Sequence, residues 1–469
     1  MQRFTALSRA LLLLLAISTD AIEETQTSAK VDGSARRREQ NSINTKKPNI
    51  LLILADDVGT GDIPYYWKDS GVDMPNLDRL SSMGVTFTDA HATPLCAPSR
   101  YMLLSGNYPH RGVAPQGSWG LSGQDQNQFL SGQRSIAEVL KEEAGYSTAM
   151  FGKWHLGAGV PRSSSSSVNK THLLSDPRHD WSQPLIDGPQ DIGFDTSLIS
   201  VSGIQRDPYA FFRNGYLEID PSEAILWDGG SYPMPHGISM IQKGKYRGEG
   251  DKDWDSSAYN MILVNETIKF VDNHLDSGKE DPFFAYVALG AVHTPHSPPY
   301  RYLNGEKVAG VYPDTHMDML YEMDLVVGSL VSLIEDKGLA EDTIIIFASD
   351  NGGLGDMHGT PSDVHDSSGP LRGSKAMIYE GGHRIPMIIR HDKSFPPNEE
   401  RSHLVGLNDL YATLLDLVGV AVPNLSAQDS MSFSDYIFSG SNTNGLREEL
   451  ATFAFQFGSF FVSFTCYIF

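Results

Sequence analysis

The apolar residues of this chain gather in uninterrupted runs of strand length, separated by segments with helical spacing. Continuous apolar runs are typical of strands that are buried on both faces of a parallel sheet. The two clearest runs are residues 48–56 and 343–349, and each ends in acidic and glycine residues. Shorter runs predict further strands at residues 146–151, 282–290 and 385–390.

Segments with apolar residues on one helical face lie between these runs, and several are closed by a glycine. They predict helices at residues 74–84, 135–145, 262–275, 320–334 and 404–418. Alternating strands and helices predict an α/β fold, with a doubly wound, mostly parallel central sheet flanked by helices. The polar stretch at residues 160–255 predicts insertion loops over a site on this domain.

The two ends of the chain differ in composition from its middle. Residues 1–21 have the basic start and short apolar core of a secretory signal, and residues 22–45 form a polar linker. A catalytic domain is expected at 46–425, followed at 426–469 by a small or truncated C-terminal subdomain. The small residues, polar spacer and apolar tail of that last segment are also typical of a glycolipid-anchor signal. We therefore expect a protein of the secretory pathway that is secreted, lysosomal or attached to the cell surface.

Charge and cysteine content narrow the classes of function. The formal net charge of −22 argues against nucleic acids and anionic membranes as partners. An anionic substrate would therefore need local cations. Two cysteines cannot form a disulfide framework in an oxidising compartment, although a bridge between Cys96 and Cys466 is one alternative. Chemistry explains Cys96 better than a structural role does.

The segment around Cys96 reads Cys-Ala-Pro-Ser-Arg, and the residues after Pro98 predict a helix that ends at Gly106. Cys96 would lie at the N-terminus of this helix, where backbone N–H groups and the helix dipole favour an anion. We therefore expect Cys96 to be the centre of a site that processes an anion.

Polar side chains follow several of the predicted strands, at the sheet edge where ligands gather in open α/β proteins. They are Asp56, Asp57, Lys153, His155, His293, Asp350 and Asn351. Capping of turns is the alternative role for the first two aspartates. Three carboxylates and an amide are ligands for Ca²⁺ or Mg²⁺, whereas zinc would require more histidine or cysteine. Arg100, Lys153 and Lys375 are candidate cations for an oxyanion.

These residues resemble the motifs of one family, the formylglycine-dependent (type I), arylsulfatase-like sulfatases of the alkaline phosphatase-like superfamily. The resemblance extends over residues 48–420. The matching segments are 49–61, 96–100, 152–157, 293–296, 349–353 and 373–375.

The resemblance implies that Cys96 is oxidised to Cα-formylglycine by a formylglycine-generating enzyme, which reads the unfolded motif. The hydrated aldehyde would attack sulfur with one hydroxyl and expel sulfate with the other. It also implies one Ca²⁺ per chain, held by Asp56, Asp57, Asp350, Asn351 and the modified Cys96.

The resemblance assigns roles to the remaining candidates as well. Lys153, Lys375 and His293 would bind sulfate, and Arg100 and His155 would support the hydrate. His155 would be the base for elimination, and His293 with Lys375 would protonate the leaving alcohol. Weaker candidates for substrate contacts are His296, Arg372 and His383.

Two alternatives to a sulfatase remain. A phosphatase or phosphodiesterase of the same superfamily would use unmodified Cys96, but Asn351 follows Asp350 where related zinc enzymes have histidine. A catalytically silent carbohydrate-binding protein would keep the pocket without maturing Cys96. The expected substrate is a carbohydrate or aryl sulfate, either a small molecule or a polysaccharide. Aromatic residues of the insertion could stack on sugar rings or pack a core of their own: Tyr209, Phe211, Phe212, Tyr216, Trp227 and Trp254.

Overall fold

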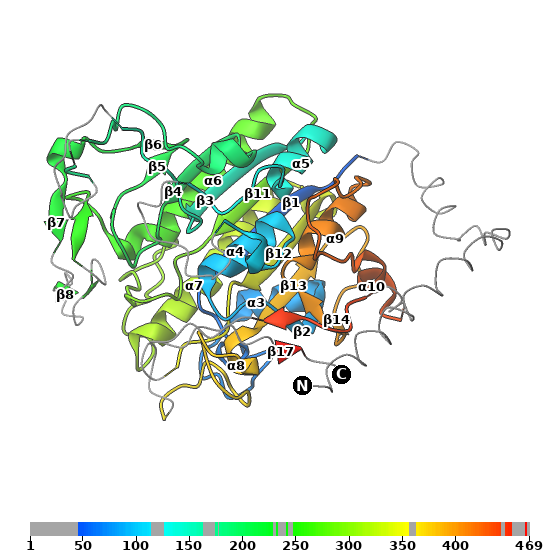
Figure 1. Cartoon of the computed structure of the whole chain (residues 1–469). Helices are drawn as coiled ribbons and strands as arrows, with labels where there is room; N and C mark the ends of the chain where they lie inside the picture. Colours follow the sequence, from blue (N-terminus) through cyan, green and yellow to red (C-terminus); the bar gives the residue numbers. More distant parts are fainter. Residues whose placement is uncertain are drawn as a thin grey trace, which may run out of the picture. The chain divides into compact units, whose positions relative to one another are not determined.

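The computed structural model describes one compact unit that begins at Lys47 (Figure 1). The described residues are 46–113, 126–162, 174–176, 178–227, 231–232, 241–242, 247–355, 363–441, 446–452 and 465–466. The predicted signal and linker at 1–45 and much of the predicted tail segment lie outside these ranges. No helix in the described ranges is long and apolar enough to cross a membrane.

An eleven-stranded sheet runs through the unit in the order β14-β2-β13-β12-β1-β11-β3-β4-β5-β6, with β15 also paired to β2. Its strands are β1 Asn49–Ala55, β2 Val85–His91, β3 Ser147–Lys153, β4 Thr196–Ser200, β5 Phe212–Arg213, β6 Tyr216–Leu217, β11 Phe283–Ala288, β12 Thr343–Ser349, β13 Arg384–Arg390, β14 Glu399–Arg401 and β15 Val405–Gly406. The central strands β12, β1, β11, β3 and β4 are parallel, whereas β13 is antiparallel to both neighbours. The predicted α/β fold with a mostly parallel sheet is confirmed.

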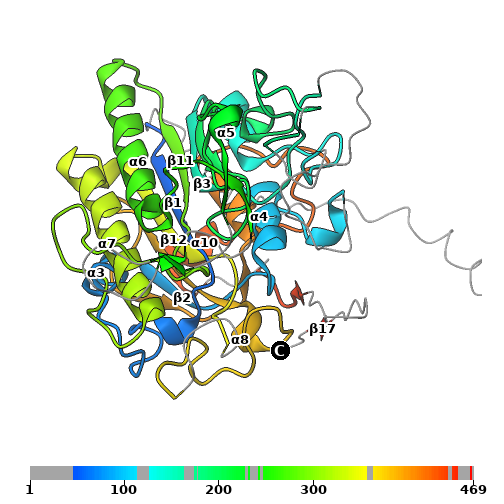
Figure 2. The same ribbon diagram turned by 90° about the vertical axis from the view of Figure 1, so that its left-hand side faces the viewer.

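Helices cover both faces of this sheet (Figure 2). They are α3 Pro75–Met83, α4 Cys96–Ser105, α5 Ile136–Ala144, α6 Tyr259–Asp276, α7 Thr315–Asp336, α8 Glu380–His383, α9 Asp409–Leu417 and α10 Ser434–Ser439. Every residue of β1 is buried, and its side chains alternate between two cores. Leu52 packs in the core with α4, α5 and α9, whereas Leu51 packs in the core with α3, α6 and α7. This is why β1 reads as a continuous apolar run.

The topology directs several loops to one edge of the sheet. Parallel β1, β3, β11 and β12 all end there, so the residues that follow them meet. Because β13 is antiparallel, its N-terminal end lies at this edge and brings the preceding loop with Lys375 to it. Strand β2 ends at the same edge and leads directly into α4, whose first residue is Cys96.

Two sequence-based boundaries need correction. The predicted helix at 404–418 begins only at Asp409, because Val405–Gly406 form β15 beside β2. The helix predicted after Pro98 begins two residues earlier, so that Cys96 itself is in the first turn. Gly106 ends α4 in a left-handed conformation, as its position predicts.

The predicted insertion loops at 160–255 need a further correction, because β4 Thr196–Ser200 lies within this segment and pairs in parallel with β3 in the main sheet. Around β4 the segment carries small strands. Besides β5 and β6 these are β7 Ile225–Trp227, β8 Ser231–Tyr232, β9 Ile241–Gln242 and β10 Gly248–Gly250. Two further short strands, β16 Ala451–Thr452 and β17 Thr465–Cys466, pair in the C-terminal segment. Among the insertion's aromatic residues, Trp254 packs against Tyr209, Phe211 and Tyr259 of α6, and only Tyr216 is half exposed. These rings therefore mainly build a local core.

Candidate active site

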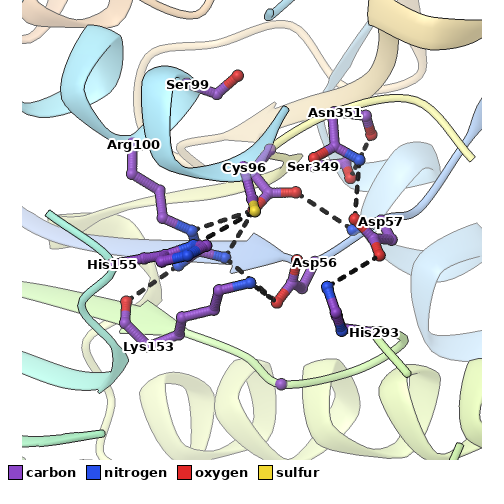
Figure 3. Close-up of polar contacts among 12 residues, drawn as sticks. Asp56, Asp57, Cys96, Ser99, Arg100, Lys153, His155, His293, Ser349 and Asn351 are labelled. Atoms are coloured by element: carbon purple, nitrogen blue, oxygen red, sulfur yellow. Dashed lines mark hydrogen bonds and ion pairs between the residues drawn. The ribbon is translucent and has the colours of Figure 1, made fainter. Parts of the chain in front are cut away.

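The acidic residues that follow β1 and β12 meet at the carboxyl edge of the sheet (Figure 3). The backbone N–H of Asp57 donates to Asp350 Oδ1 over 3.2 Å, and the Asn351 amide donates to Asp57 Oδ1 over 2.9 Å. Asp56, Asp57, Asp350 and Asn351 are all at most 1% exposed. Two aspartates that lie 293 residues apart in sequence are thus joined by a direct hydrogen bond.

Three cations lie against these carboxylates: Arg100 and Lys153 are fully buried, and the Lys375 side chain is 13% exposed. Arg100 donates twice to Asp350 Oδ2, over 3.0 and 2.7 Å, and a third time to the carbonyl oxygen of Lys153. The Lys153 ammonium is 2.6 Å from Asp56 Oδ2, and Lys375 pairs with Asp57 Oδ1. Each carboxylate therefore has one cation. These three cations place positive charge at the site, although the whole protein has a net charge of −22.

Three buried oxygens of the same cluster accept no hydrogen bond, namely Asp56 Oδ1, Asp57 Oδ2 and Asn351 Oδ1. An unsatisfied buried polar atom costs about 1–3 kcal/mol, so three side by side call for a ligand. Burial and the charge of Asp56 also raise the pKa of Asp350 to about 7, despite Arg100. Buried carboxylate and amide oxygens that lack a hydrogen-bond donor fit a hard divalent cation such as Ca²⁺.

Cys96 faces this cluster from the first turn of α4. It is a free cysteine, 6% exposed, and its Sγ lies 3.3 Å from Nδ1 of His155. Cys96, Asp56 and Asp350 each place one potential ligand atom within 4.8 Å of the other two. Burial raises the pKa of the Cys96 thiol, although Lys153 acts against this shift. The unmodified side chain is therefore a neutral thiol at neutral pH. The side chain of Cys466, the partner in the alternative bridge, lies outside the described part of the chain.

The two histidines of the site are both neutral around pH 7. Burial lowers the pKa of His155 well below its usual value, and Lys153 and Arg100 add to the effect. Burial and Lys375 lower the pKa of His293 to about 3. Nδ1–H of His293 donates to the carbonyl oxygen of Thr294 over 2.6 Å, which leaves the lone pair on Nε2. That Nε2 lies 3.6 Å from Asp57 Oδ2.

Backbone strain coincides with the site. Asp57 and His155 have φ values of 68° and 57°, in the left-handed region that residues with a Cβ avoid. Such conformations cost about 1–3 kcal/mol and persist where the surroundings over-determine them. Here they hold the Asp57 carboxylate beside the Asn351 amide and the His155 imidazole against Cys96.

Sequence reasoning overlooked one supporting residue, and its three weaker candidates have contacts of their own. Ser349 Oγ accepts a hydrogen bond from the Val58 backbone and donates to the Asn351 carbonyl, which ties the ends of β1 and β12 together. In the sequence, the position of Ser349 immediately before Asp350 was the sign that it could support the site. Among the weaker candidates, His296 packs on His316, Arg372 lies over the Tyr379 ring, and His383 Nδ1 is 2.8 Å from His91 Nδ1.

A doubly wound α/β sheet whose carboxyl edge gathers acidic residues, lysines and a helix N-terminus defines an enzyme of the alkaline phosphatase-like superfamily. A family model described as "Sulfatase" matches residues 48–420 of this chain. The chain therefore belongs to the sulfatase family and is a sulfuric ester hydrolase.

Individual relatives agree with this membership. The chain is 31% identical to an N-acetylgalactosamine-6-O-sulfatase of Bacteroides thetaiotaomicron, over 84% of this chain and 77% of that protein. It is 28% identical to the N-acetylgalactosamine-6-sulfatase of Canis lupus familiaris, over 85% and 67%. A solved structure from work on glycosaminoglycan metabolism by B. thetaiotaomicron has a TM-score of 0.69 at 27% identity, covering 87% of this chain and 85% of that chain.

Proposed function

We propose that this protein hydrolyses sulfate esters of carbohydrates, using a Cα-formylglycine formed from Cys96 and one bound Ca²⁺. The observation that carries the proposal is the position of Cys96. Its side chain is buried at a helix N-terminus, against His155 and beside carboxylate and amide oxygens that lack hydrogen-bond donors. A structural cysteine would need none of these neighbours.

The residues present fit both implied groups. Asp56, Asp57, Asp350 and Asn351, together with residue 96, would hold the calcium ion. Bound calcium would polarise the sulfate group and favour a deprotonated hydroxyl at residue 96. Converted to formylglycine, residue 96 would supply a nucleophilic hydroxyl as the hydrate of its aldehyde.

The chain's own side chains would bind sulfate and move protons. The Lys153 and Lys375 ammonium groups, now paired with Asp56 and Asp57, would hold the sulfate oxygens. Neutral His155, whose Nδ1 faces residue 96, would accept a proton from a hydroxyl there. His293 Nε2 carries a lone pair in the free site and therefore has no proton to donate. We assign the proton for the leaving alcohol to Lys375, and His293 would orient that alcohol.

Carbohydrate sulfates are favoured as substrates by the relatives named for N-acetylgalactosamine 6-sulfate. Other relatives at 27–28% identity are steryl-sulfatases, so family membership alone does not select the sugar. The insertion contributes little aromatic surface for stacking, since Tyr209, Phe212 and Trp254 are at most 3% exposed. We therefore expect polar groups to recognise the sugar.

The same geometry disfavours the alternative of a phosphatase with unmodified Cys96. Nucleophilic cysteines act as thiolates, and their pKa is lowered by nearby positive charge. Here burial dominates and raises the pKa of Cys96, so the thiolate is scarce at neutral pH. An oxygen nucleophile at this position removes that difficulty.

Two measurements test the proposal. Both use protein that has been secreted by cells that contain a formylglycine-generating enzyme. Mass spectrometry of the tryptic peptide 80–100 should show that the sulfur of Cys96 is replaced by an aldehyde oxygen. Sulfate release should be measured on a panel that contains N-acetylgalactosamine 6-sulfate, other sulfated sugars, a steroid sulfate and an aryl phosphate. A fully retained thiol together with sulfate release would refute the formylglycine scheme. Release of phosphate but not sulfate would refute the reaction itself.

Replacement of Lys375 by alanine should lower kcat/KM for a sulfate ester by about 10²–10³-fold, because a largely enclosed cation that meets developing charge is lost. If Lys375 protonates the leaving alcohol, kcat should fall more for an alkyl sulfate than for an aryl sulfate, whose alcohol leaves without help. Lys337→Ala, a surface lysine paired with Asp272 at the end of α7, is the matched control and should retain full activity. Equal losses on both substrates would contradict the acid role.

A further inference from the structure

A second group of metal-ligating side chains lies beside the catalytic loops and has no part in the proposed reaction. We call it the histidine cluster; it comprises Asp62, His296, His316 and His365. Asp62 belongs to the 3-10 helix η1 Thr60–Asp62 after β1, His316 to the first turn of α7, and His365 to the segment 363–369. His296 follows β11, three residues beyond His293.

Three members of the histidine cluster are close enough to share one ion, and the fourth, His296, packs against one of them. Asp62, His316 and His365 each place one potential ligand atom within 4.8 Å of the other two. Nε2 of His365 is 2.7 Å from Asp62 Oδ1. The His316 ring lies between the rings of His365 and His296, with centroid distances of 5.5 and 4.9 Å.

Burial makes this composition unusual. Asp62 and His316 are fully buried, and His365 is 5% exposed. A hydrogen-bonded pair would explain Asp62 and His365, but it gives no reason to bury a second imidazole, that of His316, and to pack a third, that of His296, against it. Imidazoles are costly to bury as cations, and burial holds the pKa of His316 well below its usual value. A neutral imidazole is the form that binds metals.

We propose that the histidine cluster is a structural site for a divalent transition metal, with zinc the favoured ion, held by Asp62, His316 and His365 and completed by His296. Nitrogen ligands with a single carboxylate select zinc over calcium, and four protein ligands make the closed site typical of structural zinc. Each imidazole binds through a proton-free nitrogen. Binding therefore releases to solvent the proton that His365 and Asp62 share in the ligand-free protein.

The site would join segments that support the catalytic edge. The N–H of Gly61 donates to the carbonyl oxygen of Ser367 over 3.0 Å. A Cβ on Gly59 would lie 2.1 Å from that same oxygen, and one on Gly353 would lie 2.4 Å from Ser367 Cβ. The segment 363–369 thus packs without gaps against the loops that carry Asp57 and Asn351. An ion that fixes His365 to Asp62 and α7 would hold this packing.

The test is a metal titration of the full chain. Protein freed of metal with a chelator is returned to buffer with excess Ca²⁺, equilibrated with Zn²⁺ and separated from free ions, and both metals are measured by mass spectrometry. We expect about one tightly bound zinc per chain and a higher Tm, since a ligand that binds only the folded state stabilises it. Zinc that remains far below one per chain would overturn the proposal.

Variants locate the ion. His316→Gln and His365→Gln should each weaken zinc binding by at least about tenfold while calcium content stays unchanged. His274→Gln is the matched control, because His274 is another buried histidine, bound only to the carbonyl oxygen of Asp281 and outside the cluster. If the variants fold poorly, Co²⁺ in the wild-type chain gives a second readout, the visible absorption of a tetrahedral site. Zinc retained in both variants, or cobalt without that absorption, would overturn the proposal. Neither result bears on sulfate hydrolysis.

Discussion

Replacement of Cys96 by serine should reduce sulfate release by more than about 10³-fold, the usual consequence of removing a catalytic nucleophile. Serine has nearly the same shape, so the first turn of α4 should form unchanged. It is not a substrate for the usual maturation of cysteine to formylglycine, so no aldehyde hydrate can form. The variant would keep a hydroxyl beside the metal ligands and lose only the second oxygen.

Three measurements separate this loss of chemistry from a loss of structure. Purified Cys96→Ser should keep the calcium content and the Tm of the wild type, and only its turnover should fall. Met102→Leu is the control in the same helix, because it conserves volume at a fully buried position and should cost less than about 1.5 kcal/mol. Wild-type turnover by Cys96→Ser would contradict the proposed role of residue 96.

Replacement of Asp350 by alanine should remove both bound calcium and much of the stability of the fold. Asp350 is fully buried and accepts two of the hydrogen bonds of Arg100, which is itself 0% exposed. Removing one partner of a buried ion pair leaves an uncompensated charge, at a cost of about 3–5 kcal/mol. The calcium site would also lose a charged ligand.

The two effects of Asp350→Ala are measured separately. Metal analysis should show calcium reduced to traces, and denaturant unfolding in excess chelator should show the loss of stability that remains without metal. Asp350→Asn keeps an oxygen for Arg100 and should recover part of the stability but little of the calcium. Asp272→Ala, at a half-exposed position in α6, is the control and should change stability by less than about 0.5 kcal/mol. Unchanged calcium in Asp350→Ala would exclude Asp350 as a ligand.

The sequence predicts the centre of this fold well and its margins poorly, for a physical reason. Strands β1 and β12 are buried on both faces, so their apolar runs match the observed Asn49–Ala55 and Thr343–Ser349 closely. The segment 404–418 is apolar as well, but Val405 is buried by pairing with β2 rather than by helix packing. A short apolar run does not show whether its residues are buried in a strand of the sheet or in a packed helix.

The candidate site shows the same division. Asp56 and Asp350 can be found because each follows a buried strand, and parallel strands deliver their ends to one edge. The position of Lys375 depends on β13 running antiparallel, which no local pattern indicates, so only its glycine-flanked context and the family resemblance made it a candidate. The histidine cluster escaped notice because His316 and His365 are isolated in sequence, 49 positions apart, and meet only through tertiary packing.

The contact between Arg100 and Asp350 also sets the earliest time at which α4 can reach its folded surroundings during synthesis. Helix α4 cannot make its native contact with Asp350 until the ribosome has synthesised Asp350. That residue follows Arg100 by 250 positions in the sequence. At a synthesis rate of about 5–20 residues per second, that interval lasts about 12–50 s. Under the proposed function, a maturing enzyme that reads Cys96 in the open chain would have this time as a minimum, and the insertion at 160–255 would lengthen it. Shortening the insertion should therefore lower the matured fraction of Cys96 even where the folded site is unchanged. The length of chain between two contacting residues would then help determine how much active enzyme a cell obtains.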